Sequence, residues 1–122
     1  MFDHIALHVD DLAASIRFYT AALAPLGHQL GYEDETCAGF GPADAPALWL
    51  YAATAEAGPP GRISHVALKA SDHATVDRFH AAGLQAGGRD HGTPGLLPDY
   101  GETYYAAFLL DPDGNNVEAV NL

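Results

Sequence analysis

Hydrophobic and polar positions alternate along two stretches of the chain, 3–9 and 63–70. In the first stretch Ile5, Leu7 and Val9 fall on one face, and histidine and alanine side chains occupy the other. A period of two is typical of a strand with one buried face. Both stretches are therefore predicted to be half-buried strands.

A helical pattern follows each of these strands. Apolar residues at helical spacing predict one helix over about 12–26, ending at Gly27, and a second that runs to about Gly83. The expected N-caps are Asp10 or Asp11 for the first helix and Ser71 or Asp72 for the second. Short extended stretches are expected after the helices at 28–33, 36–41 and 47–53, and then at about 86–90, 103–111 and 115–121.

The two halves of the chain are copies of one unit. When the sequence is shifted by 61 residues, ten of the 24 positions from His4 to Gly27 are identical. This repeat predicts two units of the order strand–helix–strand–strand–strand, over about 1–58 and 62–122, within a single domain of residues 1–122. A Gly-Pro-Pro-Gly cluster at 58–61 is interpreted as the linker.

Composition excludes several classes of function. The 122 residues carry a formal net charge of −11, which argues against a nucleic-acid partner and against docking on an anionic membrane. The only cysteine, Cys37, excludes an intramolecular disulfide and a cysteine-based metal cage. The chain has neither a long apolar run nor the basic start of a signal peptide, so we expect a cytoplasmic protein.

The ordered motifs resemble those of the vicinal oxygen chelate superfamily, which includes glyoxalase I, fosfomycin-modifying enzymes, bleomycin-resistance proteins and extradiol dioxygenases. The resemblance covers essentially the whole chain and implies an α+β fold, with two tandem βαβββ units forming a half-open barrel around one cavity. The motifs are Asp-His-Ile-Ala-Leu-His-Val-Asp at 3–10, Ser-His-Val-Ala at 64–67 and Asp-Pro-Asp-Gly-Asn-Asn-Val-Glu at 111–118.

Three residues form a candidate metal site. Alternation places His4, His65 and Glu118 on the face opposite the aliphatic residues of their strands, so all three point into one cavity if the two units pack around it. Two imidazoles and one carboxylate suit Fe(II), and also Zn, Mn, Ni or Co. In the superfamily, metal ligands sit on the first and last strands of each unit, which matches these positions. We therefore expect one divalent metal ion.

The fourth position of such a site falls on Trp49. Glyoxalase I enzymes carry a second carboxylate there, and tryptophan can neither bind the metal nor accept a proton. This departure disfavours glyoxalase I activity and leaves a site with three protein ligands.

Further residues are candidates for proton transfer, namely His8, His91 and Tyr105, or for the substrate pocket, namely Trp49, Tyr100 and Tyr105. His8 shares the face of His4, as a substrate group or as a histidine at the rim. Residues 89–102 are predicted to be a loop, either a lid or plain surface, and contribute His91 and Tyr100. Of the neighbouring Tyr104 and Tyr105, only one can face the cavity, and we expect Tyr105. Surface positions are expected for His28, His73 and His80.

Two classes of function fit this pattern. The first is a metal-dependent enzyme, a lyase, isomerase or extradiol-type dioxygenase, in which the metal acts as a Lewis acid on a small oxygen-rich substrate. The second is a metal-free protein that sequesters a small molecule, as bleomycin-resistance proteins do; a third possibility is a duplicated domain that has lost its chemistry. The resemblance also implies a homodimer, with the metal site either within one chain or shared between two.

Overall fold

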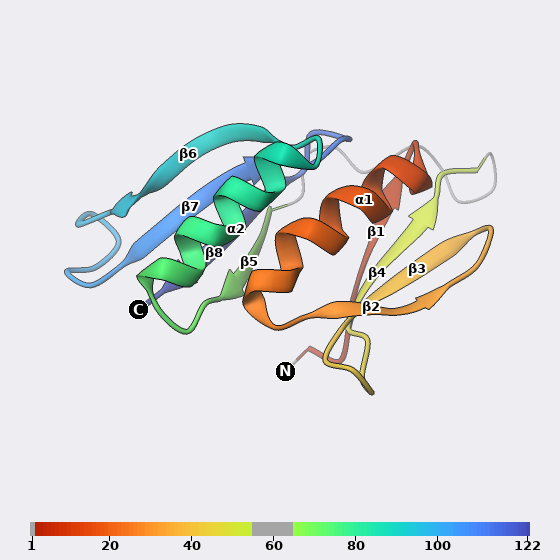
Figure 1. Cartoon of the computed structure of the whole chain (residues 1–122), viewed down its shortest axis with the longest axis horizontal. Helices are drawn as coiled ribbons and strands as arrows, with labels where there is room; N and C mark the ends of the chain where they lie inside the picture. The colour runs from red at the N-terminus through yellow and green to blue at the C-terminus, as the bar shows by residue number, and fades with distance from the viewer. Residues whose placement is uncertain (1, 55–64) are drawn as a thin grey trace.

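The computed structural model describes residues 2–54 and 65–122, which form two units of the same architecture (Figure 1). The first unit contains β1 (Ile5–Val9), α1 (Leu12–Leu23), the short 3-10 helix η1 (Ala24–Leu26), β2 (Gln29–Glu33), β3 (Cys37–Gly41) and β4 (Leu48–Ala52). The second contains β5 (His65–Lys69), α2 (His73–Gln85), β6 (Arg89–Leu96), β7 (Tyr105–Leu110) and β8 (Asn116–Asn121). The predicted α+β fold of two βαβββ units is confirmed. The predicted linker at 58–61 lies outside the described residues.

Each unit has one four-stranded sheet, and the two sheets share one topology. The strand orders are β1-β4-β3-β2 and β5-β8-β7-β6. In each unit the first and last strands pair in parallel, and the remaining pairs are antiparallel. Both helices lie on the same side of the molecule, in front of their sheets in Figure 1. The opposite faces of the two sheets, called here the open faces, therefore point the same way within one chain.

Capping residues define the helix ends as the sequence predicts. Asp11 accepts a hydrogen bond from the backbone N–H of Ala14, and Asp72 accepts one from that of Thr75. Each side chain satisfies an N–H that the first helical turn leaves without a partner. Gly27 ends the first helical region with a φ of 82°, a conformation that costs glycine little.

The hydrophobic core lies between the helices and the sheets. It combines the inward-facing residues of the strands with one side of each helix. Burial of this area from water is the main stabilising contribution. Its largest fully buried apolar side chains are Phe18, Tyr19, Leu23, Phe40, Leu50, Phe79 and Leu109.

A turn of the second unit locks onto the helix of the first. The Tyr19 hydroxyl donates to a carboxylate oxygen of Asp111 at 2.7 Å, and both side chains are fully buried. Asp113 accepts hydrogen bonds from the Asp10 backbone N–H and the Ser15 hydroxyl. Burial, together with the adjacent Asp111 carboxylate, raises the pKa of Tyr19 well above its ordinary value. The turn between β7 and β8 thus joins the two units through polar contacts inside the core.

The predicted loop at 89–102 is partly wrong. Residues 89–96 form strand β6, which pairs antiparallel with β7. The glycines and the proline of this segment do not abolish the strand. They accompany two register shifts, between Asp90 and Gly92 and between Gly92 and Gly95, and Pro94 lies within the second. Proline is tolerated in a strand where the ladder is interrupted in this way.

The predicted surface position of His80 is also wrong. Its side chain is 9% exposed, and its Nε2 lies 2.9 Å from an Asp90 carboxylate oxygen. This contact is the main cause that lowers the pKa of Asp90, and it ties α2 to the start of β6.

Within the described residues, no helix is both long enough and apolar enough to cross a membrane.

Candidate functional site

The larger candidate site is a pocket on the open face of the second sheet. It has a volume of about 440 Å³ and is open to solvent. Strands β5 to β8 and the connection between β6 and β7 supply its walls. The lining residues are His65, His91, Gly92, Leu97, Tyr100, Phe108 and Asn116.

A buried carboxylate lies beside this pocket. Glu118 on β8 is 2% exposed, yet alternation places it on the open face, opposite the side of Val117 and Ala119. One carboxylate oxygen lies 2.8 Å from Nε2 of His65, and the other accepts a hydrogen bond of 2.5 Å from the Tyr104 hydroxyl. Charged groups are rarely buried without partners, because desolvation is costly. Here the two partners compensate Glu118 and also cover it.

Tyr104 holds the Glu118 carboxylate from the side opposite His65. The hydrogen bond to Glu118, assisted by burial and by the carboxylate charge, raises the pKa of Tyr104 to about 12. Its hydroxyl therefore keeps its proton at neutral pH and acts as a donor. The tautomer in which His65 carries its proton on Nε2 makes the imidazole the second donor.

Local sequence explains how the pocket stays open. Phe108 on β7 stands directly opposite Glu118 in the strand register and faces the pocket. Gly92 on β6 pairs with Phe108, and a Cβ at this position would lie 2.8 Å from the phenyl ring. The absence of a side chain at Gly92 lets the ring lie against the β6 backbone.

Asn116 is a polar group of the pocket that is not among the predicted site residues. Its side-chain oxygen is buried and makes no hydrogen bond within the described part of the chain. Asn116 stands opposite His65 in the β5–β8 register. The period of β8 places Asn116 on the same face as Glu118, so alternation is the sequence signal that indicates this position. His91, which the sequence offered as a group for proton transfer, lines the pocket.

The third predicted ligand lies apart from this pair. His4 precedes β1 in the first unit, and its Nδ1 lies 2.7 Å from a carboxylate oxygen of the exposed Asp3. Within residues 2–54 and 65–122, no group of three or more histidine, cysteine, aspartate or glutamate side chains is arranged to hold one metal ion. One chain therefore brings together His65 and Glu118 but not His4.

Two other predicted residues lie on the open face of the first sheet. His8 on β1 stands opposite Tyr51 of β4 in the register, with ring centroids 6.1 Å apart. Trp49 lies two residues before Tyr51 on the same face, and their rings are stacked at 6.4 Å. Trp49, predicted for the substrate pocket, is half-buried on the first sheet, and within one chain it does not line the pocket beside Glu118 on the second sheet.

The predicted orientation of Tyr105 is wrong. Its hydroxyl donates to Asp77 of α2, and its ring stacks on His73 at 3.9 Å with an interplanar angle of 8°. Tyr104 takes the place expected for it. Strand β7 carries apolar residues on both faces, so alternation alone does not decide which tyrosine turns outward. Tyr100 lies at the pocket, 72% exposed, with its ring 5.5 Å from that of Tyr104.

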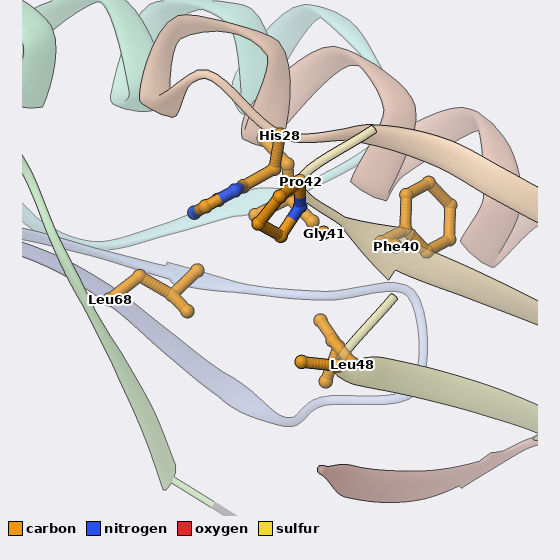
Figure 2. A pocket seen from close by; sticks show the side chains of 8 residues that line it. His28, Phe40, Gly41, Pro42, Leu48 and Leu68 are labelled. Carbon is orange, nitrogen blue, oxygen red and sulfur yellow. The ribbon is translucent and has the colours of Figure 1, made fainter. Parts of the chain in front are cut away.

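A smaller pocket lies where the two units meet, and Figure 2 shows it from close by. Its volume is about 80 Å³, and apolar groups from α1, β3, β4, β5 and the β3–β4 connection form most of its wall. His28 extends its imidazole toward Leu68, and its buried Nδ1 makes no hydrogen bond within the described residues. A single histidine among apolar groups offers no paired acid and base, so the Glu118 pocket is the better candidate for chemistry.

Comparisons with known proteins agree with this geometry. A family profile described as "Glyoxalase/Bleomycin resistance protein/Dioxygenase superfamily" matches residues 1–119. A search of curated proteins gives no significant match.

Solved structures share the fold over nearly the whole chain. A glyoxalase/bleomycin resistance protein from Albidiferax ferrireducens T118 is 30% identical, with a TM-score of 0.83 over 98% of this chain and 97% of that one. A glyoxalase I mutant from Zea mays is 27% identical, with a TM-score of 0.73 over 97% of this chain but only 44% of that one. A family enzyme from Burkholderia phytofirmans PsJN, 18% identical with a TM-score of 0.74 over 98% and 96%, supports the fold alone.

Proposed function

The chain belongs to the Glyoxalase/Bleomycin resistance protein/Dioxygenase superfamily, and from this premise we propose that it is a metal-dependent enzyme acting on a small oxygen-rich substrate in the Glu118 pocket. The reaction class is a lyase, an isomerase or an extradiol-type dioxygenase. The observation that carries the proposal is the pair formed by the buried Glu118 carboxylate and His65 Nε2, 2.8 Å apart beside a pocket of about 440 Å³.

The chemistry of this pair fits a divalent metal ion. A carboxylate oxygen and an imidazole nitrogen are both good ligands for Zn, Fe, Mn, Ni and Co. Glu118 is already desolvated, and Tyr104 fixes the orientation of its carboxylate. When bound, the metal supplies Lewis acidity, which polarises substrate oxygens. Two ligands from one chain leave at least one further protein ligand to be found.

We assign the third ligand to His4 of a second copy of the chain. Both helices cover the same side, so the open faces of the two units cannot face each other within one chain (Figure 1). In a homodimer, the open face of the first unit of one chain can lie against the open face of the second unit of its partner. This arrangement closes a cavity between the two chains. Such a dimer offers His4 to His65 and Glu118 without requiring either unit to refold.

The other residues of the pocket have distinct roles in this proposal. His91 on β6 is exposed to the pocket and is the histidine best placed to hold or move a proton at the substrate. Asn116 offers a free acceptor for a substrate hydroxyl or amine. Phe108 and Tyr100 supply aromatic surface for the apolar part of a substrate. Tyr104 is a positioning residue, because it acts through Glu118.

A metal-free sequestering protein is the second candidate. The observation that favours it is that no third histidine, cysteine, aspartate or glutamate joins the pair within the described part of one chain. In that function the open pocket binds a small molecule without turnover, and the hydrogen bonds of Glu118 serve only to stabilise the sheet.

Metal content separates the two candidates. The untagged protein, purified without chelator, is analysed for metal beside Glu118→Gln, which keeps the shape of the side chain but removes its charge. We expect about one metal ion per chain in the parent and a loss of at least about tenfold in affinity in the variant, because a charged ligand is removed. Glu102→Gln, the same change at an exposed glutamate of the same unit, is the matched control.

The assignment of His4 needs its own measurement. His4→Ala is expected to lower metal affinity as Glu118→Gln does, and mixing the His4→Ala and Glu118→Gln proteins is expected to restore about one intact site in each mixed dimer. Parent protein without metal after reconstitution refutes the enzyme proposal and favours sequestration. Metal binding that survives His4→Ala refutes only the shared site.

A further inference from the structure

Four rings form a continuous row across the open face of the first sheet, called here the aromatic row: His8, Tyr51, Trp49 and Tyr32. Neighbouring ring centroids are 6.1, 6.4 and 5.7 Å apart along the row. Tyr32 is 47% exposed and Tyr51 is 38% exposed. Exposed aromatic rings in one patch usually mark a binding surface, because leaving such an area in water is unfavourable.

A glycine leaves room for the Trp49 ring over the neighbouring strand β3. Gly39 of β3 pairs with Trp49 in the neighbouring strand β4 and with Tyr32 in the neighbouring strand β2. A Cβ at this position would lie 2.9 Å from the Trp49 ring and 3.1 Å from Pro46 Cβ. The indole therefore occupies the space that a side chain of β3 would fill, and it bridges β4 and β2.

The end of the row is held in place by a negatively charged side chain. The Tyr32 hydroxyl donates to the Asp34 carboxylate at 2.9 Å. Asp34 also accepts backbone and side-chain hydrogen bonds from Thr36, which keep its pKa below the usual range and the group ionised. The acidic side chain thereby fixes the tyrosine ring at the sheet edge.

The charge of the whole first unit has the same sign. Residues 2–54 contain seven aspartates and glutamates but one basic residue, Arg17. Arg17 belongs to α1, which covers the other face of the sheet. Strands β1 to β4 contain no lysine or arginine. Electron-rich ring faces in a negative field attract cations and repel anions.

We propose that the aromatic row is a binding surface for a flat aromatic ring that carries a positive charge. The ligand stacks on Trp49 and is flanked by Tyr32 and Tyr51. Stacking selects the flat ring, and the ring faces together with the acidic surroundings select its charge.

This inference names the class of ligand for the proposed function. It rests on the proposed function in one respect only, namely that the partner's pocket forms the wall of the cavity opposite the aromatic row. In the proposed dimer, the aromatic row of one chain faces the pocket of its partner. The row itself belongs to one unit of one chain, so ring binding and metal binding are measured separately.

The chain offers a direct probe, because Trp49 is its only tryptophan. Trp49 emission is followed during titration with N-methylquinolinium, quinoline, quinoline-2-carboxylate and the saturated cation N,N-dimethylpiperidinium, with calorimetry as a second readout. We expect N-methylquinolinium to quench the emission saturably. The dissociation constants of quinoline and of the saturated cation are expected to be about tenfold higher. The carboxylate is expected not to bind.

Substitutions locate the binding to the row. Tyr32→Leu and Tyr51→Leu are each expected to weaken N-methylquinolinium binding about threefold to tenfold, since each removes one ring contact. Tyr32→Phe, the matched control, keeps the ring and is expected to bind as the parent does. Gly39→Ala displaces the indole and is expected to weaken binding as well. All four variants are expected to keep the metal content of the parent.

Three results would overturn the inference. The first is the absence of saturable binding by any of the rings, including the case in which a second copy covers Trp49 and emission depends only on protein concentration. The second is equal affinity for quinoline-2-carboxylate and N-methylquinolinium, which refutes the role of charge. The third is unchanged binding in Tyr32→Leu and Tyr51→Leu. A loss of metal binding with intact ring binding would refute the proposed enzyme but not this surface.

Discussion

Removing one oxygen atom from Tyr19 tests how the two units are held together. Its hydroxyl is fully buried and donates at 2.7 Å to Asp111, which is also fully buried. Tyr19→Phe deletes this hydrogen bond and leaves the packing of the ring unchanged. Asp111 still accepts hydrogen bonds from the backbone of Asp113 and from the backbone and side chain of Asn115. Its carboxylate therefore loses one of its donors but stays hydrogen-bonded.

The expected cost follows from the burial of both groups. A hydrogen bond to a charged group contributes about 1.5–3 kcal/mol, and this one is shielded from competing water. For a domain of this length the entropy of unfolding is about 0.26 kcal/mol/K, so the melting temperature is expected to fall by about 6–12 °C. The contact joins α1 of the first unit to the β7–β8 turn of the second. The losses of free energy and of melting temperature are therefore expected for the unfolding of both units together.

Chemical denaturation followed by far-ultraviolet circular dichroism measures the free energy of unfolding, and calorimetry measures the melting temperature. Tyr100→Phe, which removes a hydroxyl from a tyrosine that is 72% exposed, is the control and is expected to change stability by less than about 0.5 kcal/mol. A Tyr19→Phe protein as stable as this control would refute the conclusion that the buried contact joins the units. Two separate unfolding transitions in the variant would instead support it strongly.

Two further predictions concern the second helix. Hydrogen bonds from Thr75 lower the pKa of Asp72, so its contribution to stability is present above the ordinary aspartate pKa near 4 and is lost as the pH falls through the lowered value. Asp72→Asn, which keeps a good N-cap, is therefore expected to reduce the slope of stability against pH below about pH 4 in acid titrations; an unchanged slope would contradict this. Gly83→Ala places a methyl group against Leu109 and 3.3 Å from Phe18 in the helix contact, and crowding of about 1–3 kcal/mol is expected to exceed the gain of about 1 kcal/mol in helix propensity. Denaturation beside Gly101→Ala, where the nearest atom is 3.7 Å away, measures the difference, and a stabilised Gly83→Ala would show that the contact relaxes.

The periodicity of the chain determined its elements and their order. Alternation in β1 and helical spacing in α1 are patterns of residues close together in the chain. They can be read locally, because each element must turn its apolar residues toward one buried side. Internal identity between the halves then required the same unit twice. The caps at Asp11 and Asp72 were equally local, because an N-cap side chain bonds to a backbone N–H three residues away.

Strand pairing decided what the periodicity left open. Residues 89–96 contain glycines and a proline that indicate a loop, yet pairing with β7 makes them a strand with two register shifts. Tyr104 precedes β7 and Tyr105 begins it, and because this strand has apolar residues on each face, contacts with Glu118 and Asp77 decide how the two tyrosines are oriented. His80 has a polar helical context, but its burial depends on Asp90, ten residues away.

The candidate site divides along the same line. The sequence by itself predicted His65 and Glu118 on the open faces of their strands and His4 on the same face of the stretch 3–9, because alternation fixes the direction of a side chain relative to its own sheet. Only the tertiary structure decided which of them meet. It brings His65 to Glu118 through the parallel β5–β8 pair and leaves His4 beside Asp3, because both helices cover one side and turn the two open faces the same way. The distance between groups on different sheets depends on how whole units pack, and no local pattern in the sequence encodes that.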